Sequence, residues 1–471
     1  MRAYLVNLWD AIRASYWFIP GLFATAALVI AVVLPWVDAA VARSSTAQLP
    51  DWILTTTTTA RATLSALAGA MVAVTGTVFS ITVVTLSLTS QQFGPRLLRR
   101  FMHDLPTQIT LGALLATGLY CLLLLRVVEK HDNALSAPHL SVLVAIGLAI
   151  VSIISLIVFI HHIAVLIQAP HIVAAVARDL DDAIDRLFPE RIGQPSRDED
   201  QRLVHARAQQ ADMSDDYSTI RSLCEGYVQA IDGDGLLQLA AERDFIARLH
   251  ARPGKFVAKD EALADIWSLN VDLEESPLEE LTALINEKII VGNRRTPRQD
   301  VECAVEELVE VAVRSLSTGI NDPFTAINCV DRLGAALGRL AQRKIPDAAR
   351  FDAQGQMRIT VHPIAFVEVI DAAFNQIRQY GKESVGVTLR ALEALAVVAD
   401  KVWRQEDRDA VYRHAQMIAR NGDHFRERHD VDAVTRRLER VQENLNRERL
   451  DSAQQPGVAS GKQGSTFPAL S

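Results

Sequence analysis

Long uncharged segments dominate the first third of the chain. Runs of 24, 34, 21 and 45 consecutive residues contain no Asp, Glu, Lys or Arg. A helix needs about 20 apolar residues to cross the hydrocarbon core of a bilayer, so each run is long enough. The pattern predicts a transmembrane domain over residues 1–170. Its four spans are expected near residues 17–37, 64–88, 107–127 and 141–167.

After residue 170 the hydrophobic pattern becomes that of a folded polar domain. Short strand-like pieces such as GYVQAID (226–232) and Phe245–Leu249, separated by Gly and Pro, predict a small β-rich subdomain over 226–270. Amphipathic periodicity then predicts a mainly helical domain over 271–450, with a helical exit and linker over 171–225 before them. The Gly-, Ser- and Gln-rich tail at 451–471 is expected to be disordered. The predicted fold class is therefore a membrane α-helical protein with four transmembrane helices, followed by a cytoplasmic α+β domain with a β-rich subdomain and a helical bundle.

Two sequence motifs predict helix starts in this second part. Asp322-Pro323 has the cap residue and the first-turn proline that commonly open a helix. Thr296, followed by Pro297 and Gln299, matches a capping box. The helix that precedes the one at Asp322 is therefore expected to begin at Thr296. Further amphipathic helices are expected near residues 363–380, 384–403, 407–422 and 429–449.

Charge separates the two parts. The first 170 residues carry a formal charge of +3 and the remainder carries −11. An apolar, slightly basic front joined to an acidic back excludes a purely soluble enzyme, a secreted disulfide scaffold and a nucleic-acid binder with a basic face. The predicted partner is a lipid bilayer.

Basic residues in the short loops predict the orientation. Arg2 and Arg13 precede the first span, and Arg96, Arg99 and Arg100 follow the second span. The opposite loops carry bases that nearby acids partly balance. Because cytoplasmic loops are enriched in Lys and Arg, we expect the N-terminus in the cytoplasm. Four spans then return the C-terminal domain to the same side.

The second predicted span has two chemically different faces. At about 100° per residue, small residues gather on one face and threonines gather on the opposite one. Small residues allow helices to pack closely in lipid, and a hydroxyl face is suited to a hydrated path. The alternative is that each Thr bonds the carbonyl four residues earlier and packs against another helix. The helix-packing candidates are Gly69, Gly76 and Ser80, and the pore-lining candidates are Thr75, Thr82, Thr85 and Thr89.

Two polar segments of the second part gather most of its candidate ligand-binding residues. Arginines near helix starts are suited to anion binding, because free backbone amides point out of a helix N-terminus. The same residue types are also the ordinary vocabulary of helix caps and turns. The ligand-binding candidates are Arg294, Arg295, Arg298, Asn321, Asp322 and Thr325.

The sequence contains no recognisable catalytic or metal-binding motif. His161 and His162 lie at the end of the fourth span and His171 follows it, but the sequence places no carboxylate or thiol next to them. Interfacial histidines therefore explain this cluster better than a metal site does. The four cysteines show no CxxC spacing. We expect no enzyme, no cofactor and no metal.

Several motifs are familiar together. FSITVVTLSLTSQQFGPRLL (79–98), GYVQAID (226–232), RPGKFV (252–257), RRTPRQD (294–300) and SLSTGINDPFTAINCVDRL (315–333) resemble the bacterial predicted membrane protein family catalogued as domain of unknown function 2254. The resemblance covers approximately residues 8–440. It implies a multi-pass protein of the bacterial inner membrane and transfers no catalytic residues.

Two functional hypotheses follow. The first is an oligomeric channel-like or transport protein, with the second span at the central axis and the cytoplasmic domain as the gate. The alternative is a membrane-anchored sensor or scaffold that binds a small anion or a protein partner in the cytoplasm. In both cases we expect a homo-oligomer in the inner membrane that binds no nucleic acid, and a small anion or solute is a further candidate partner.

Overall fold

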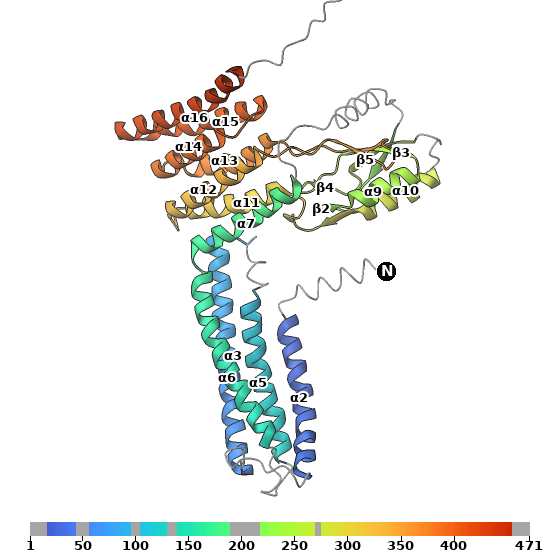
Figure 1. Cartoon of the computed structure of the whole chain (residues 1–471), viewed down its shortest axis with the longest axis vertical. Helices are drawn as coiled ribbons and strands as arrows, with labels where there is room; N and C mark the ends of the chain where they lie inside the picture. Colours follow the sequence, from blue (N-terminus) through green and yellow to red (C-terminus); the bar gives the residue numbers. More distant parts are fainter. Residues whose placement is uncertain are drawn as a thin grey trace, which may run out of the picture. The chain divides into compact units, whose positions relative to one another are not determined.

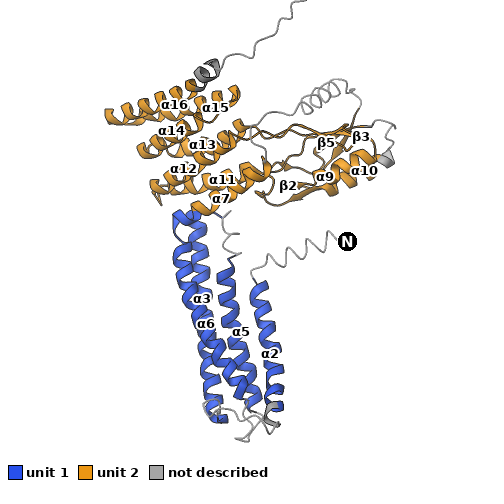
Figure 2. Cartoon of the chain, viewed as in Figure 1, with its two compact units in different colours: residues 1–172 blue, residues 173–471 orange. Residues whose placement is uncertain are grey.

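The computed structural model describes residues 17–43, 56–95, 104–129, 139–188, 217–268 and 275–454. The chain divides into two compact units, Met1–Ile172 and Val173–Ser471 (Figure 2). We refer to them as the N-terminal unit and the C-terminal unit. The basic cluster at 96–100, residues 189–216 of the predicted linker and the tail from 455 onward lie outside the described residues.

The N-terminal unit contains the four predicted spans. Each is a helix that is long and apolar enough to cross a membrane. The strongest of these windows, in α6, has a mean hydropathy of 3.1. The helices are α2 (Phe18–Arg43), α3 (Thr57–Phe93), α5 (Leu105–Glu129) and α6 (His139–Leu166) (Figure 1).

Helix α5 is the centre of this unit. It contacts α2, α3 and α6, and it is the most buried of the four helices. Two glycines of α5 allow close approach. A Cβ atom at Gly112 would lie 3.1 Å from the ring of Phe23 in α2, and one at Gly118 would lie 3.4 Å from Met71 in α3. Close van der Waals packing of this kind holds helices together in lipid.

Hydroxyl groups join α5 to α6. The hydroxyls of Thr110 and Ser155 lie 2.8 Å apart, as do those of Thr117 and Ser152. The Tyr120 hydroxyl donates to the Ser141 carbonyl at 2.9 Å. Such bonds between helices are favourable in hydrocarbon because water is not there to replace them.

Asp38 of α2 caps the start of α6. Its carboxylate accepts from the backbone amides of Leu140 and Ser141, each at 2.9 Å. A carboxylate at a helix N-terminus satisfies free amides and complements the helix dipole. This cap is supplied by a residue about 100 positions earlier in the chain, so it ties the ends of two spans together.

The C-terminal unit combines two sheets with a layer of helices (Figure 1). The predicted helices at 363–380, 384–403, 407–422 and 429–449 correspond to four observed helices. The last of them extends to Gln454, past the predicted start of the tail at residue 451. Its elements are α7 (Ala169–Leu187), β1 (Ser218–Arg221), β2 (Gly226–Ile231), α9 (Gly233–Glu242), β3 (Phe245–Leu249), β4 (Phe256–Val257), β5 (Ala262–Ser268), α10 (Glu275–Lys288), β6 (Ile289–Gly292), α11 (Val301–Ser315), α12 (Pro323–Leu340), β7 (Ala349–Phe351), β8 (Met357–Thr360), α13 (Phe366–Tyr380), α14 (Val385–Ala399), α15 (Gln405–Ala419), a 3₁₀ turn η2 (Arg420–His424) and α16 (Arg428–Gln454).

The strands form two sheets that extend beyond the segment 226–270. The larger sheet has the order β1-β5-β3-β8-β7, and the smaller has the order β4-β2-β6. All described pairings are antiparallel except that of β3 with β8, where Arg248 lies beside Thr360. The hairpin of β7 and β8 therefore joins a sheet whose other strands lie about 100 residues earlier.

One hydrophobic core lies between the sheets and the helices α9 and α10. Its fully buried members include Val228 of the small sheet, Ala247 of the large sheet, Leu236 of α9 and Ile285 of α10. The opposite side of β3 faces away from this core, because successive side chains of a strand point to opposite faces. Arg248 and His250 lie on that opposite side.

The observed caps agree with one predicted helix start and correct the other. Asp322 caps α12, since its carboxylate accepts from the amides of Phe324 and Thr325. The predicted start at Thr296 is wrong, because Asp300 caps α11 by accepting from the amide of Cys303 at 3.0 Å. The Thr296 hydroxyl instead donates to the Gln229 carbonyl.

Asp407, in the first turn of α15, is a buried carboxylate. It is 3% exposed, and its Oδ2 atom has no hydrogen-bond partner among the described residues. Burial raises the pKa of Asp407 to about 6, although Arg404 at 3.6 Å opposes the shift.

Asp407→Asn should change how the stability of this unit depends on pH. Asp407 ionises near pH 4 in the unfolded chain but only near 6 in the folded one, so its contribution to stability is lost as the pH rises between these values. That loss is at most roughly 3 kcal/mol. Urea unfolding of both full-length proteins in detergent micelles measures this effect. As the pH rises through this window, the free energy of unfolding of the variant should increase relative to that of the wild type. A difference that is constant with pH would contradict the assignment.

Candidate functional site

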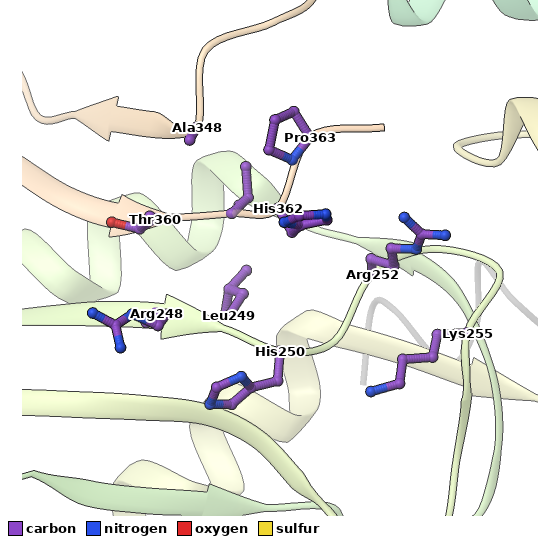
Figure 3. Close-up of a pocket in the computed structure, with 10 residues that line it drawn as sticks. Arg248, Leu249, His250, Arg252, Lys255, Ala348, Thr360, His362 and Pro363 are labelled. Atoms are coloured by element: carbon purple, nitrogen blue, oxygen red, sulfur yellow. The ribbon is translucent and has the colours of Figure 1, made fainter. Parts of the chain in front are cut away.

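A cavity of about 570 Å³ opens in the C-terminal unit where the parallel strands β3 and β8 end. The segments that follow these strands diverge, and the cavity lies between them (Figure 3). Ligand sites in sheets commonly lie at the carboxyl ends of parallel strands. The volume is within the usual range for sites that hold small molecules.

Half of the residues around this cavity carry basic side chains, and none is acidic. Four of the other lining residues are apolar. We call this set the basic cavity. Its lining residues are Arg248, Leu249, His250, Arg252, Lys255, Ala348, Thr360, Val361, His362 and Pro363.

The strand β3 holds two of the basic groups. The guanidinium carbon of Arg248 lies 5.0 Å from the centre of the Trp267 ring, a cation–π contact. The Nε2 atom of His250 lies 2.7 Å from Oδ2 of Asp265, whose other oxygen accepts from the Thr219 hydroxyl at 3.1 Å. The neighbouring strands therefore orient both side chains.

The turn after β3 holds the next two basic groups. Arg252 donates to Glu368 of α13 at 2.9 Å and to Glu302 of α11 at 3.3 Å. Lys255 lies 3.6 Å from Glu261. These two cations are partly compensated by acids outside the cavity wall. Within the part of the chain that the structure describes, Arg248 and His362 have no carboxylate partner.

Gly254 seats this turn against a buried ion pair. Its φ of +88° is a conformation that favours glycine. A Cβ atom at this position would lie 2.1 Å from Oδ2 of Asp300. Asp300 in turn receives two hydrogen bonds from Arg295, at 2.7 and 3.0 Å. The turn that carries Arg252 and Lys255 can therefore approach the pair only because Gly254 has no side chain.

Acidic groups surround Arg295. Its remaining guanidinium nitrogen donates to Glu306 at 2.7 Å. Burial alone would lower the pKa of Arg295, but its bonds to Asp300 and Glu306 raise it. Burial raises the pKa of Glu302, Arg252 opposes that shift, and the charges of Asp300 and Glu368 add to it. The ion pairs thus form one connected network beneath the basic cavity.

The structure does not bring the six predicted ligand-binding residues together. Arg294, Arg295 and Arg298 precede α11, whereas Asn321, Asp322 and Thr325 follow it, and α11 is roughly 22 Å long. Arg295 is occupied by Asp300 and Glu306, while Arg294 and Arg298 are exposed. The second group forms the start of α12, where the Thr325 hydroxyl donates to Asp322 at 2.6 Å.

The two faces of α3 lie in different surroundings. Thr82, Thr85 and Thr89 are at most 6% exposed, so they face other helices of the same chain. Thr75 and Thr82 donate to carbonyls four residues earlier, at 2.6 and 2.8 Å. The small face is exposed instead: Ser80 is exposed, and a Cβ atom at Gly69 or Gly76 would meet nothing within 4 Å.

Sequence reasoning missed the basic cavity and the carboxylate–histidine pairs. The cavity residues come from two segments about 100 positions apart, and no local motif joins them. His162 also has a carboxylate neighbour, since its Nε2 atom lies 2.7 Å from Asp104 at the start of α5. Among the described residues, no group of three His, Cys, Asp or Glu side chains is placed to hold a metal ion.

Comparison with known proteins places the chain among membrane proteins. The model of a family described as predicted membrane protein (DUF2254) matches residues 13–397. Uncharacterized proteins of Mycobacterium bovis and Mycobacterium tuberculosis are 30% identical over 362 residues, which is 77% of this chain and 68% of theirs. No solved structure matches the chain.

Gly254→Ala should destabilise the C-terminal unit more than Gly355→Ala. Both glycines have positive φ, and the strain of a side chain there is roughly 1–3 kcal/mol. Only the substitution at Gly254 would also bring a methyl group against Asp300, because the space around Gly355 is open. Urea midpoints of the two full-length variants test this difference, and equal losses would show that Gly254 does not seat the turn on the ion pair.

Proposed function

We propose that this chain, which belongs to the DUF2254 family of predicted membrane proteins, is a membrane-anchored sensor that binds a small anion in the basic cavity. The proposal is a binding role without catalysis. It includes the orientation expected from the loop charges, with the N-terminus and the C-terminal unit on the cytoplasmic side of a bacterial inner membrane.

The observation that carries this proposal is the charge of the cavity wall. Five of its ten lining residues are Arg, Lys or His, although the chain after residue 170 has a net charge of −11. Arg248 and His362 have no acid partner among the described residues. Acids outside the wall pair with His250, Arg252 and Lys255, so a bound anion would supply the charged partner that Arg248 lacks.

The residue types favour a phosphorylated organic ligand. Arginine donates two parallel hydrogen bonds to phosphate, and lysine adds a point charge. Leu249, Val361 and Pro363 offer an apolar surface for the rest of the molecule. A cavity of about 570 Å³ has room for both parts.

Phosphate and pyrophosphate should stabilise the full-length protein in nanodiscs against heat, relative to chloride at equal ionic strength. At a concentration tenfold above the dissociation constant, the gain is about 1.4 kcal/mol.

Arg248→Gln should weaken binding at least tenfold, because a hydrogen bond to a charged group is worth roughly 1.5–3 kcal/mol. Calorimetry of pyrophosphate binding measures this loss.

Arg243→Gln is the matched control. Arg243 is an exposed arginine of the same unit that pairs with Glu280 outside the cavity. It should bind pyrophosphate like the wild type. Absence of any binding to the wild type, or equal binding by the wild type and Arg248→Gln, would refute the proposed site.

A homo-oligomer within the membrane is the second part of the proposal. The specific observation is the exposed small face of α3, where Gly69 and Gly76 have open space around them. Small residues let the backbone of another helix approach closely. The channel-like role expected from the sequence would depend on such an assembly, because Thr82, Thr85 and Thr89 face other helices of the same chain.

Gly76→Leu should weaken self-association if α3 meets a second copy there. The leucine would separate the two backbones. The fraction of chains that can be cross-linked as dimers in liposomes should therefore fall severalfold. Gly147→Leu on α6 is the control, since the space around Gly147 is also open. Equal cross-linking of both variants would place the contact elsewhere or exclude it.

A further inference from the structure

The end of α7 is fixed against the start of α11. The Arg186 side chain donates to the carbonyls of Arg298 and Pro297, at 3.0 and 3.1 Å. The apolar side of α7 is buried along its length, with Val176 and Ile184 at most 1% exposed. The contact with the 297–298 turn therefore belongs to a packed helix.

The same end of α7 is fixed against the end of α12. Asp181 lies 3.1 Å from Arg339, and Asp185 pairs with Arg343. From the first pair to the second, α7 advances by one turn while the chain passes from the last turn of α12 to Arg343 just beyond it, so α7 and α12 run in the same direction. Because α11 and α12 are joined by a short turn, α11 runs in the opposite direction.

The turn at 316–322 therefore lies at the other end of α7, where that helix begins. Helix α7 begins at Ala169, and the fourth span ends at Leu166. The covalent connection keeps this end of α7 next to the bilayer boundary. Helices α11 and α12 are similar in length to α7. Along the helix axes, the turn between them therefore lies about level with the first residues of α7.

This turn presents apolar side chains to its surroundings. Phe324 is 80% exposed and Ile320 is 41% exposed. Tyr380 at the end of α13 is 59% exposed. The end of α13 lies beside the turn, because a Cβ atom on the residue after Tyr380, Gly381, would lie 3.6 Å from Leu316. We call Ile320, Phe324 and Tyr380 the apolar tip.

The backbone of the turn is well supported. The amides of Ile320 and Asn321 donate to the Ser317 carbonyl, at 3.1 and 2.8 Å. Asp322 is held by its role as the cap of α12. No Asp, Glu, Lys or Arg occurs from residue 315 to 321. The turn is thus ordered, and its one charged residue, Asp322, is engaged as the cap of α12.

We propose that the apolar tip inserts into the interfacial layer of the bilayer that the chain itself spans. Lipid is the nearest apolar phase to this end of α7, and tyrosine favours the boundary between headgroups and acyl chains. The contact would hold the C-terminal unit against the membrane at a second point besides the covalent connection. Its test needs no anion in the basic cavity.

The test places an environment-sensitive fluorophore on Phe324→Cys in the full-length protein, reconstituted in phospholipid vesicles. Cys224→Ser is the background, because Cys224 is the exposed cysteine and the other three are buried. Trp403→Cys is the matched control. Trp403 is 51% exposed, and it lies at the opposite end of α12, where Lys401 contacts Gly338.

The label at 324 should emit at shorter wavelength than the label at 403. Spin-labelled lipids should quench it severalfold more, and aqueous iodide severalfold less. Quenching of both labels by iodide alone would overturn the proposal. Protection of the label at 324 from both quenchers would also overturn it, because the tip would then be covered by protein. Tyr380→Cys should repeat the result of Phe324→Cys, and failure to do so would limit the contact to the turn and contradict the tip as defined.

Discussion

The buried ion pair between Arg295 and Asp300 organises the C-terminal unit. Asp300 caps α11, and it also fills the space that Gly254 leaves open. One carboxylate thus fixes where a helix starts and where the turn bearing two cavity cations lies. Burying a charge is expensive unless it is paired and hydrogen-bonded. The bidentate bond and the further bond to Glu306 meet that requirement, and the pair cannot separate without leaving an uncompensated buried charge.

The basic cavity and the apolar tip lie at opposite ends of the same helices. Arg252 in the cavity wall reaches Glu302 in the first turn of α11 and Glu368 in the first turn of α13. Both helices end beside the tip, where Leu316 and Gly381 are neighbours. An anion that drew Arg252 away from these carboxylates would act on both helices at their starts. Packed helices transmit such a displacement along their length, since close-packed interiors deform little.

Local patterns in the sequence predicted the elements better than their arrangement. The four spans, the strand at 245–249 and the cap at Asp322 depend on residues within a few positions of one another, so the sequence alone predicts them. The start of α11 was predicted at Thr296, because a capping box has the same residue types whether or not its side chains turn toward the helix. The pairing of β3 with β8 joins residues more than 100 positions apart, and the basic cavity exists only because of that pairing. The contact between Asp104 and His162 is hidden for the same reason.

The N-terminal unit shows why composition alone did not predict the role of its polar residues. Threonines occur on both α3 and α5, but among the described residues only those of α5 meet hydroxyls of another helix, on serines of α6. The glycines that permit close packing within the chain are Gly112 and Gly118 of the central helix, whereas the small face of α3 remains exposed. A helix with one packed face and one small, exposed face has its internal contacts satisfied. Its free face is therefore available for contacts beyond the single chain, with lipid or with another helix.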